Sequence, residues 1–173
     1  MRIFITMKSW SKIALIAIPL AGLMSCLKPA QYPDEPIIEF NRIDVYGDTA
    51  YLFINFTDGD GDIGLGDVYT DPPFDTSSIY YNNIFIKYYE KVNGQWVQGT
   101  KIPSGEPVEF NYRTLVITPS GQNKALKGEI RVMLSPTYYN PLSADSDTIM
   151  YRISMCDRAL HMSNEVESNM IVR

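Results

Sequence analysis

The sequence predicts an all-β protein that folds as a single β-sandwich. Stretches rich in Ile, Val, Tyr and Phe recur along the chain, and short turns containing Gly, Pro or Asp separate them. No window of 12 residues shows the apolar periodicity of an amphipathic helix. The spacing of these stretches gives about seven to nine antiparallel strands, and a small β-barrel is the alternative arrangement.

Each expected strand is a β-rich run flanked by turn residues. Asn93-Gly94 lies between two such runs and is the strongest hairpin signal in the chain. Gly47-Asp48 marks another hairpin, and residues 149–155 alternate clearly between two faces. The expected strands are 37–46, 51–56, 79–92, 95–97, 108–112, 115–118, 128–135, 148–156 and 164–172.

Residues 1–25 are expected to be an export signal that is not part of the fold. Residues 1–12 carry three basic side chains and no acid, and residues 13–24 form an uncharged apolar run. A run of 12 residues is too short for a membrane-spanning helix, which needs about 20. A basic start followed by a short apolar run is typical of a secretory signal peptide.

The motif Leu23-Met24-Ser25-Cys26 resembles the lipobox of bacterial lipoproteins. The resemblance implies that Cys26 is lipidated and becomes the first residue of the mature protein. Met24 departs from the pattern, because that position usually holds a smaller residue. A signal peptide that is cleaved without lipidation is the alternative. Two or more acyl chains anchor a protein stably, so the lipobox predicts a protein held on its membrane.

The mature chain divides into a spacer and a domain. Residues 26–36 contain three prolines and are expected to be an extended spacer, and residues 37–173 form the predicted sandwich domain. Removal of the signal lowers Lys plus Arg from 15 to 12 and leaves 20 acids, so the mature net charge is −8. An acidic surface argues against nucleic acid as a partner and against attachment to anionic lipids by charge.

An acidic loop is the most informative stretch of the chain. Asp58, Asp60 and Asp62 alternate with glycines, and this spacing lets their oxygens turn toward one point. No Lys or Arg lies between residues 43 and 86, whereas eight Asp do. Hard oxygen ligands suit Ca²⁺, and a divalent ion relieves the repulsion between clustered carboxylates. The sequence therefore predicts one Ca²⁺ bound by these three residues.

Other residues are expected to complete this calcium site. A backbone carbonyl near Gly64 and the carboxylate of Asp67 are the nearest candidates along the chain. Asp157 ends a predicted strand and is a further candidate if that end lies beside the acidic loop. The match to an EF-hand loop is partial, because Ile63 replaces the usual Gly and Tyr69 the usual Glu. A solvated acidic turn is the alternative interpretation.

The C-terminal segment suggests a family. The strand ending in Asp157-Arg158-Ala159, followed by a short turn and Ser163-Asn164, resembles the closing hairpin of bacterial Ig-like and fibronectin-III-like domains. Together with the lipobox, the spacer and the acidic loop, it resembles small lipoproteins of Bacteroidota. The resemblance implies an Ig-like sandwich and an outer-membrane location, at the cell surface or the periplasmic face. It says almost nothing about a ligand.

Catalytic residues are not evident. His161 is the single histidine and is expected in a solvated turn, and no Gly-x-Ser-x-Gly elbow is present. Cys156 has no partner if Cys26 is lipidated, so a buried inert thiol is expected. The acidic loop is expected to be hydrated, which does not favour the raised pKa of an acid catalyst. The chain is therefore not expected to be an enzyme.

Aromatic pairs leave a binding function open. Residues 80–81, 88–89 and 138–139 are Tyr-Tyr pairs, and one tyrosine of each strand pair is expected to point outward. Such rings and Trp96 can stack on sugars, and packing on a sheet face is the alternative. The expected function is a non-enzymatic binding or accessory module of a larger outer-membrane protein assembly. A cell-surface glycan-binding module is the alternative, followed by a surface hydrolase that uses the acidic loop.

Overall fold

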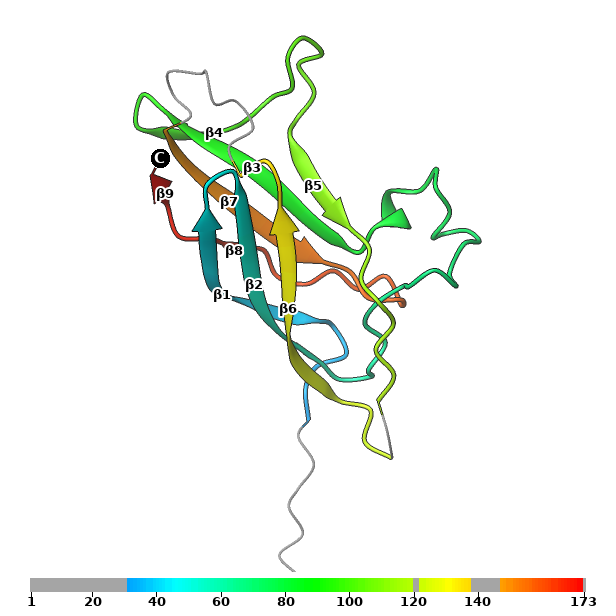
Figure 1. Cartoon of the computed structure of the whole chain (residues 1–173). Helices are drawn as coiled ribbons and strands as arrows, with labels where there is room; N and C mark the ends of the chain where they lie inside the picture. Colours follow the sequence, from blue (N-terminus) through cyan, green and yellow to red (C-terminus); the bar gives the residue numbers. More distant parts are fainter. Residues whose placement is uncertain (1–30, 120–121, 138–146, 173) are drawn as a thin grey trace, which may run out of the picture. The chain divides into compact units, whose positions relative to one another are not determined.

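The computed structural model describes residues 31–119, 122–137 and 147–172, and its strands form two antiparallel sheets (Figure 1). One sheet has the order β1-β2-β6. In the other the order is β4-β3-β7-β8, with β5 also paired to β3 and β9 to β7. The strands are β1 (Ile37–Tyr46), β2 (Thr49–Asp58), β3 (Ile84–Val92), β4 (Gln95–Gln98), β5 (Glu109–Tyr112), β6 (Leu126–Leu134), β7 (Thr148–Met155), β8 (Val166–Glu167) and β9 (Ile171–Val172).

The predicted all-β sandwich is confirmed. The described sheets remain separate and do not close into a barrel. Residues from β2, β3 and β7 supply most of the core between them, and the four alternating residues predicted to share one face of β7 are all fully buried. Tyr88 of β3 is also fully buried, and its ring centroid lies 5.9 Å from that of Tyr151 in β7. The alternation in the sequence therefore identified the buried face of β7 correctly.

Three expected strands differ from the structure. Residues 79–81 form a short 3-10 helix, because the Ser78 hydroxyl accepts a hydrogen bond from the Tyr80 amide (3.0 Å) and starts a turn. Residues 115–118 form no strand. The Ile117 amide donates to the carbonyl of Ile63 in the acidic loop (3.2 Å), so this segment pairs with an irregular partner.

The last expected strand, 164–172, is divided into β8 and β9. Between them, the Ser168 hydroxyl accepts a hydrogen bond from the Tyr151 amide (3.0 Å), and the Ser168 amide donates to the Tyr151 carbonyl (2.8 Å). A side-chain oxygen therefore takes the place of one backbone acceptor in the ladder with β7. The regular pairing is interrupted at that point, which divides the strand.

Several sequence predictions fall outside the described residues. Residues 1–30, which include the predicted signal peptide and Cys26, are among them, as are Tyr138 and Tyr139. The compact unit of the chain begins at residue 31, so the last residues of the predicted spacer belong to it. A side chain at Gly59 would collide with the carbonyls of residues 32 and 33, which shows how closely they approach the acidic loop.

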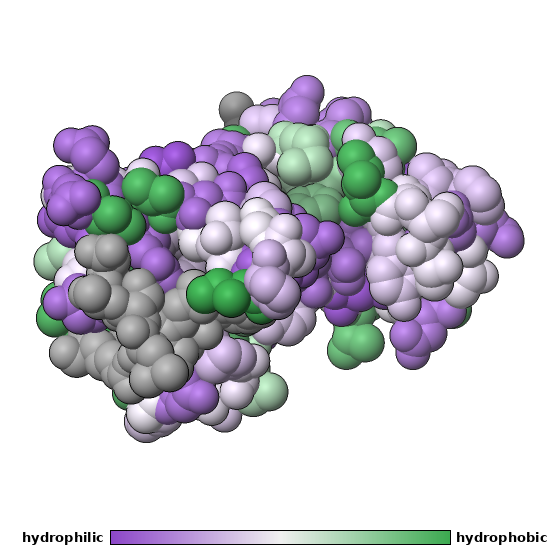
Figure 2. All heavy atoms as spheres, turned by 90° about the horizontal axis from the view of Figure 1, so that it is seen from above, coloured by the Kyte–Doolittle hydropathy of each residue, from purple (hydrophilic) through white to green (hydrophobic). Residues whose placement is uncertain are grey.

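One face of the molecule is shown as a space-filling view in Figure 2. The face shown in Figure 2 is mostly hydrophilic, with hydrophobic residues scattered in small groups. Single apolar side chains scattered over a protein surface are common. Within the described residues, no helix is long and apolar enough to cross a membrane.

Candidate metal centre

Asp58 is the last residue of β2, and its side chain is completely buried. One carboxylate oxygen, Oδ2, accepts a hydrogen bond from the Asp62 amide (2.9 Å). This bond closes the chain into a tight turn immediately after the strand, as aspartate side chains often do. The turn brings the carboxylate of Asp62 back toward that of Asp58.

Asp157 reaches the same point from the other sheet. It follows β7 directly after Cys156, and its side chain is 0% exposed. One carboxylate oxygen of Asp58, of Asp62 and of Asp157 lie within 4.8 Å of one another. The structure therefore brings together the end of a strand in each sheet, which is the condition on which Asp157 was named as a candidate ligand.

Within the part of the chain that the structure describes, three buried carboxylate oxygens of the acidic loop have no hydrogen-bond partner. They are the buried Oδ1 atoms of Asp58, Asp60 and Asp62. Buried polar atoms in folded proteins nearly always have partners, and an ionised carboxylate without one carries a large desolvation cost. The oxygens therefore have unused capacity to bind a cation, and Asp60 adds a fourth carboxylate to the three that are closest together.

Burial and mutual repulsion shift the pKa values of these groups upward. Burial is the largest cause of the rise in the pKa of Asp58 to about 7, and the charges of Asp60, Asp62 and Asp157 add to it. Burial, followed by the charge of Asp157, raises the pKa of Asp62, and burial raises the pKa of Asp157. The expectation of a hydrated loop without raised pKa values is wrong at Asp58, because that side chain is fully buried.

The other predicted ligands lie differently. Asp67 is exposed and is outside the group of three carboxylates that lie closest together. The Gly64 carbonyl accepts a hydrogen bond from the Arg158 guanidinium (2.8 Å), which also donates to the Ile63 carbonyl (3.1 Å). Arg158 therefore engages the backbone that was expected to complete the metal shell.

His161 has a partner that the sequence analysis missed. Its Nδ1 lies 3.0 Å from Oδ2 of Asp157, and its backbone amide donates to Oδ1 of the same carboxylate (2.8 Å). The nearby Asp157 charge raises the pKa of His161. The four-residue separation between Asp157 and His161 was visible in the sequence. It indicates a contact only once the turn between the two residues is known. His161 positions Asp157, and the ring remains 40% exposed.

Cys156 is unsuited to bind a soft metal here. It is a free, buried cysteine, as the sequence predicted, and burial raises the pKa of its thiol to about 12. A thiol binds metal as the thiolate, which this environment disfavours. The donors available at the junction are hard carboxylate oxygens, which suit Ca²⁺ better than Zn²⁺.

Glycines allow other segments to approach the loop. Gly61 and Gly64 both have positive φ angles, +74° and +91°. A side chain at Gly61 would collide with the Lys124 carbonyl, and one at Gly64 with the Leu115 carbonyl. These two glycines of the acidic loop are therefore required by close packing as well as by turn geometry.

In the presence of a chelator, the stability of the wild-type protein should fall as pH rises from about 4 to 8. A pKa raised in the folded state means that folding favours the protonated acid, and this stabilisation is lost as pH rises through about 7. The rise from 3.8 to about 7 at Asp58 corresponds to roughly 4 kcal/mol. Urea unfolding at several pH values measures the free energy of unfolding.

Asp58→Asn is the matched control, because the amide oxygen can still accept from the Asp62 amide but cannot ionise. The variant should lose most of this pH dependence. The free energy of unfolding of this variant should still fall slightly as pH rises, because the pKa values of Asp62, Asp157 and His161 are also raised in the folded protein. Equal pH dependence in both proteins would show that ionisation of the Asp58 carboxyl group does not lower the stability of the fold.

No protein-family model matches the chain, and no curated protein or solved structure matches it either.

Proposed function

We propose that this chain is a lipid-anchored, non-enzymatic lipoprotein of the outer membrane whose β-sandwich is completed by a structural Ca²⁺. In this proposal the domain is a binding or accessory module of a larger membrane protein assembly. The observation that carries the calcium site is the set of buried carboxylate oxygens without hydrogen-bond partners at the junction of the two sheets.

Calcium fits these donors for two reasons. The ion takes six to eight oxygen ligands in a flexible geometry, so carboxylates from a turn and from a strand end can share it. Its double positive charge also offsets the repulsion that raises the pKa values of Asp58 and Asp62. Asp58, Asp60, Asp62 and Asp157 are the proposed ligands, and backbone carbonyls or water complete the shell.

The ion would act by joining the two sheets. Asp58 ends β2 in one sheet, and Asp157 follows β7 in the other. An ion that binds only the folded protein stabilises it, by about 2.7 kcal/mol when the free ion is a hundredfold above Kd. The position of the proposed ion therefore favours a structural role.

The alternative of glycan binding has weaker support. Aromatic rings on the outer faces of both sheets are covered by basic side chains of the protein itself. The pairs are Arg42 over Phe53 (3.6 Å), Arg152 over Tyr89 (4.6 Å), Arg131 over Tyr51 (5.5 Å) and Lys91 over Trp96 (5.5 Å). A ring that already stacks with a cation offers less free surface to a sugar.

A surface hydrolase is the least supported alternative. The raised pKa of Asp58 would suit an acid catalyst, but its side chain is fully buried. An apolar groove beside β6, with Ile130, Val132 and Leu115 among its lining residues, contains none of the acids Asp58, Asp60, Asp62 and Asp157. The same carboxylates are better explained as ligands of a structural ion.

Millimolar Ca²⁺ should raise the melting temperature of the wild-type protein, by roughly 10 °C at a hundredfold excess over Kd. Asp58→Asn and Asp157→Asn should each reduce or abolish this rise. In chelator, the Asp58→Asn variant should melt higher than wild type, because one repelling charge is gone. Differential scanning calorimetry with Ca²⁺, with Mg²⁺ and with chelator measures these midpoints.

Asp71→Asn is the control for net charge, since Asp71 is exposed and lies outside the cluster. This variant should respond to Ca²⁺ as wild type does. Equal wild-type midpoints in Ca²⁺ and in chelator would refute the structural ion and leave a buried acidic junction without one.

Cys26→Ser should release a folded protein from the membrane fraction. The substitution removes the thiol that carries the proposed lipid, and the compact unit begins only at residue 31. Fractionation of cells followed by immunoblotting measures the distribution, and circular dichroism of the released protein checks its fold. Retention of Cys26→Ser in the membrane after a salt wash would contradict the proposed lipid anchor.

Purification of the native protein from membranes in mild detergent should recover a second membrane protein in a fixed ratio. Mass spectrometry of the purified material identifies that protein, and the Cys26→Ser variant is the control for anchoring. Repeated recovery of the lipoprotein alone would count against the accessory role. A glycan-array signal that Tyr81→Ala abolishes would favour the alternative instead.

A further inference from the structure

Most sheet edges in the described structure are protected against pairing with another strand. β1 contains an irregularity between Phe40 and Arg42. Its outer edge is also capped by Asn164, whose side chain accepts from the Ile38 amide and donates to the Ile38 carbonyl, both at 2.9 Å. The strands at the edges of the other sheet have only two or four residues each. Short, irregular or capped edges resist unwanted pairing.

β6 differs from these edges. It has nine residues, pairs with β2 without a bulge and lies at the end of its sheet. Two observations show which backbone groups point away from β2. The Tyr112 hydroxyl donates to the Met133 carbonyl (2.5 Å), so that carbonyl faces outward. The N–H and C=O groups of Ile38 bind Asn164, so they point away from β2. Phe56, which lies opposite Ile38, must therefore direct its own N–H and C=O groups to the other side, toward Gly128 of β6.

These observations assign the outward groups of β6. Because backbone direction alternates along a strand, the N–H and C=O groups of residues 127, 129, 131 and 133 all point to the open edge. Their side chains lie on the exposed face of the sheet. Tyr112 occupies one of the outward carbonyls, and the remaining outward groups form an edge that a further strand can extend.

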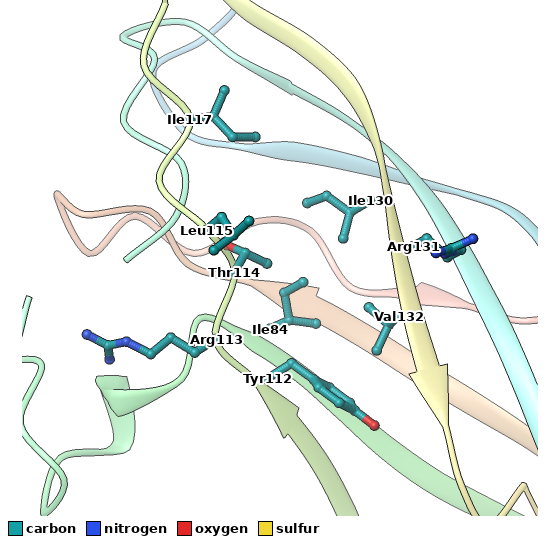
Figure 3. Close-up of a pocket in the computed structure, with 9 residues that line it drawn as sticks. All are labelled: Ile84, Tyr112, Arg113, Thr114, Leu115, Ile117, Ile130, Arg131 and Val132. Atoms are coloured by element: carbon teal, nitrogen blue, oxygen red, sulfur yellow. The ribbon is translucent and has the colours of Figure 1, made fainter. Parts of the chain in front are cut away.

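An apolar groove of about 410 Å³ lies beside this edge (Figure 3). Ile130 and Val132 of β6 point into it, toward the segment that contains Leu115, whereas Arg131 points away. Leu115 is 79% exposed although it lines the groove. A strand added at this edge would therefore cover exposed apolar surface as well as backbone groups.

We propose that β6 pairs antiparallel with β6 of a second copy of this chain, which joins the two three-stranded sheets into one sheet of six strands. The charges favour the register centred on Ile130 over the two registers next to it. Outward-directed residues must pair with one another, and in the register centred on Ile130 each Glu129 faces Arg131 of the other copy. A shift by one pairing step in either direction places Glu129 opposite Glu129, or Arg131 opposite Arg131.

The surrounding side chains fit this register. Arg42 lies 3.3 Å from Glu129 within one copy. Pairing would extend this contact into a ladder from Arg42 to Glu129 to Arg131 of the second copy, repeated on the other side of the two-fold axis. Opposite charges placed directly across an antiparallel pair stabilise it, and like charges destabilise it. On the inner face, Ile130 would meet Ile130 of the second copy beside the apolar groove.

The inference does not depend on the proposed calcium site, and it is tested by exchange of the two charges. Sedimentation velocity of the full-length protein in mild detergent should give a dimer across the micromolar range. Glu129→Arg and Arg131→Glu should each give a monomer, because like charges then face one another. The double variant Glu129→Arg/Arg131→Glu should restore the dimer. Glu167→Arg, an exposed charge on the other sheet, is the control and should remain dimeric.

A second measurement does not depend on charge. Ile130→Cys should form a disulfide-linked dimer under mild oxidation, because residues at the two-fold axis in this register form a close, non-hydrogen-bonded pair. Wild type, which retains Cys26 and the buried Cys156, is the control on the non-reducing gel. A monomeric wild-type chain, or a double variant no more dimeric than the single variants, would overturn the proposal.

Discussion

The junction between the two sheets depends on carboxylates that repel one another. Asp58 at the end of β2 and Asp157 after β7 are both fully buried, and Asp62 lies against them. The hydrogen bond from the Asp62 amide to Asp58 and the two contacts of His161 with Asp157 satisfy only part of this polar surface. The fold concentrates negative charge where its two layers meet, and the proposed Ca²⁺ would offset that charge.

The loop after this junction receives its positive charges from distant parts of the chain. No Lys or Arg lies between residues 43 and 86, but two arginines bind the backbone of that region. Arg158 donates to the carbonyls of Ile63 and Gly64. Arg113 donates to the carbonyls of Gly66, Tyr69, Phe74 and Tyr81. The guanidinium groups bind carbonyl oxygens, so the clustered carboxylates keep their unpaired oxygens.

The sequence predicted most strands, because a strand with one buried and one exposed face alternates apolar and polar residues along the chain. β7 is the clearest case, with Ile149, Tyr151 and Ile153 all buried. The strand prediction failed where side chains replaced backbone partners. Ser78 starts a turn within the Tyr-rich run, and Ser168 divides the last strand. Single hydroxyl contacts of this kind leave no periodic pattern in a sequence.

By itself, the sequence determined the all-β class and the acidic loop, since both depend on neighbouring residues: apolar alternation, and aspartates spaced by glycine. Only the tertiary structure decided which acids meet. Asp157 is 95 residues from Asp62, yet the antiparallel packing of the two sheets places them together, whereas Asp67, five residues away, is exposed. Burial, which raises the pKa of Asp58, is likewise a property of the packed sheets. Local patterns are encoded in adjacent residues, but long-range contacts and desolvation exist only after the two layers have packed.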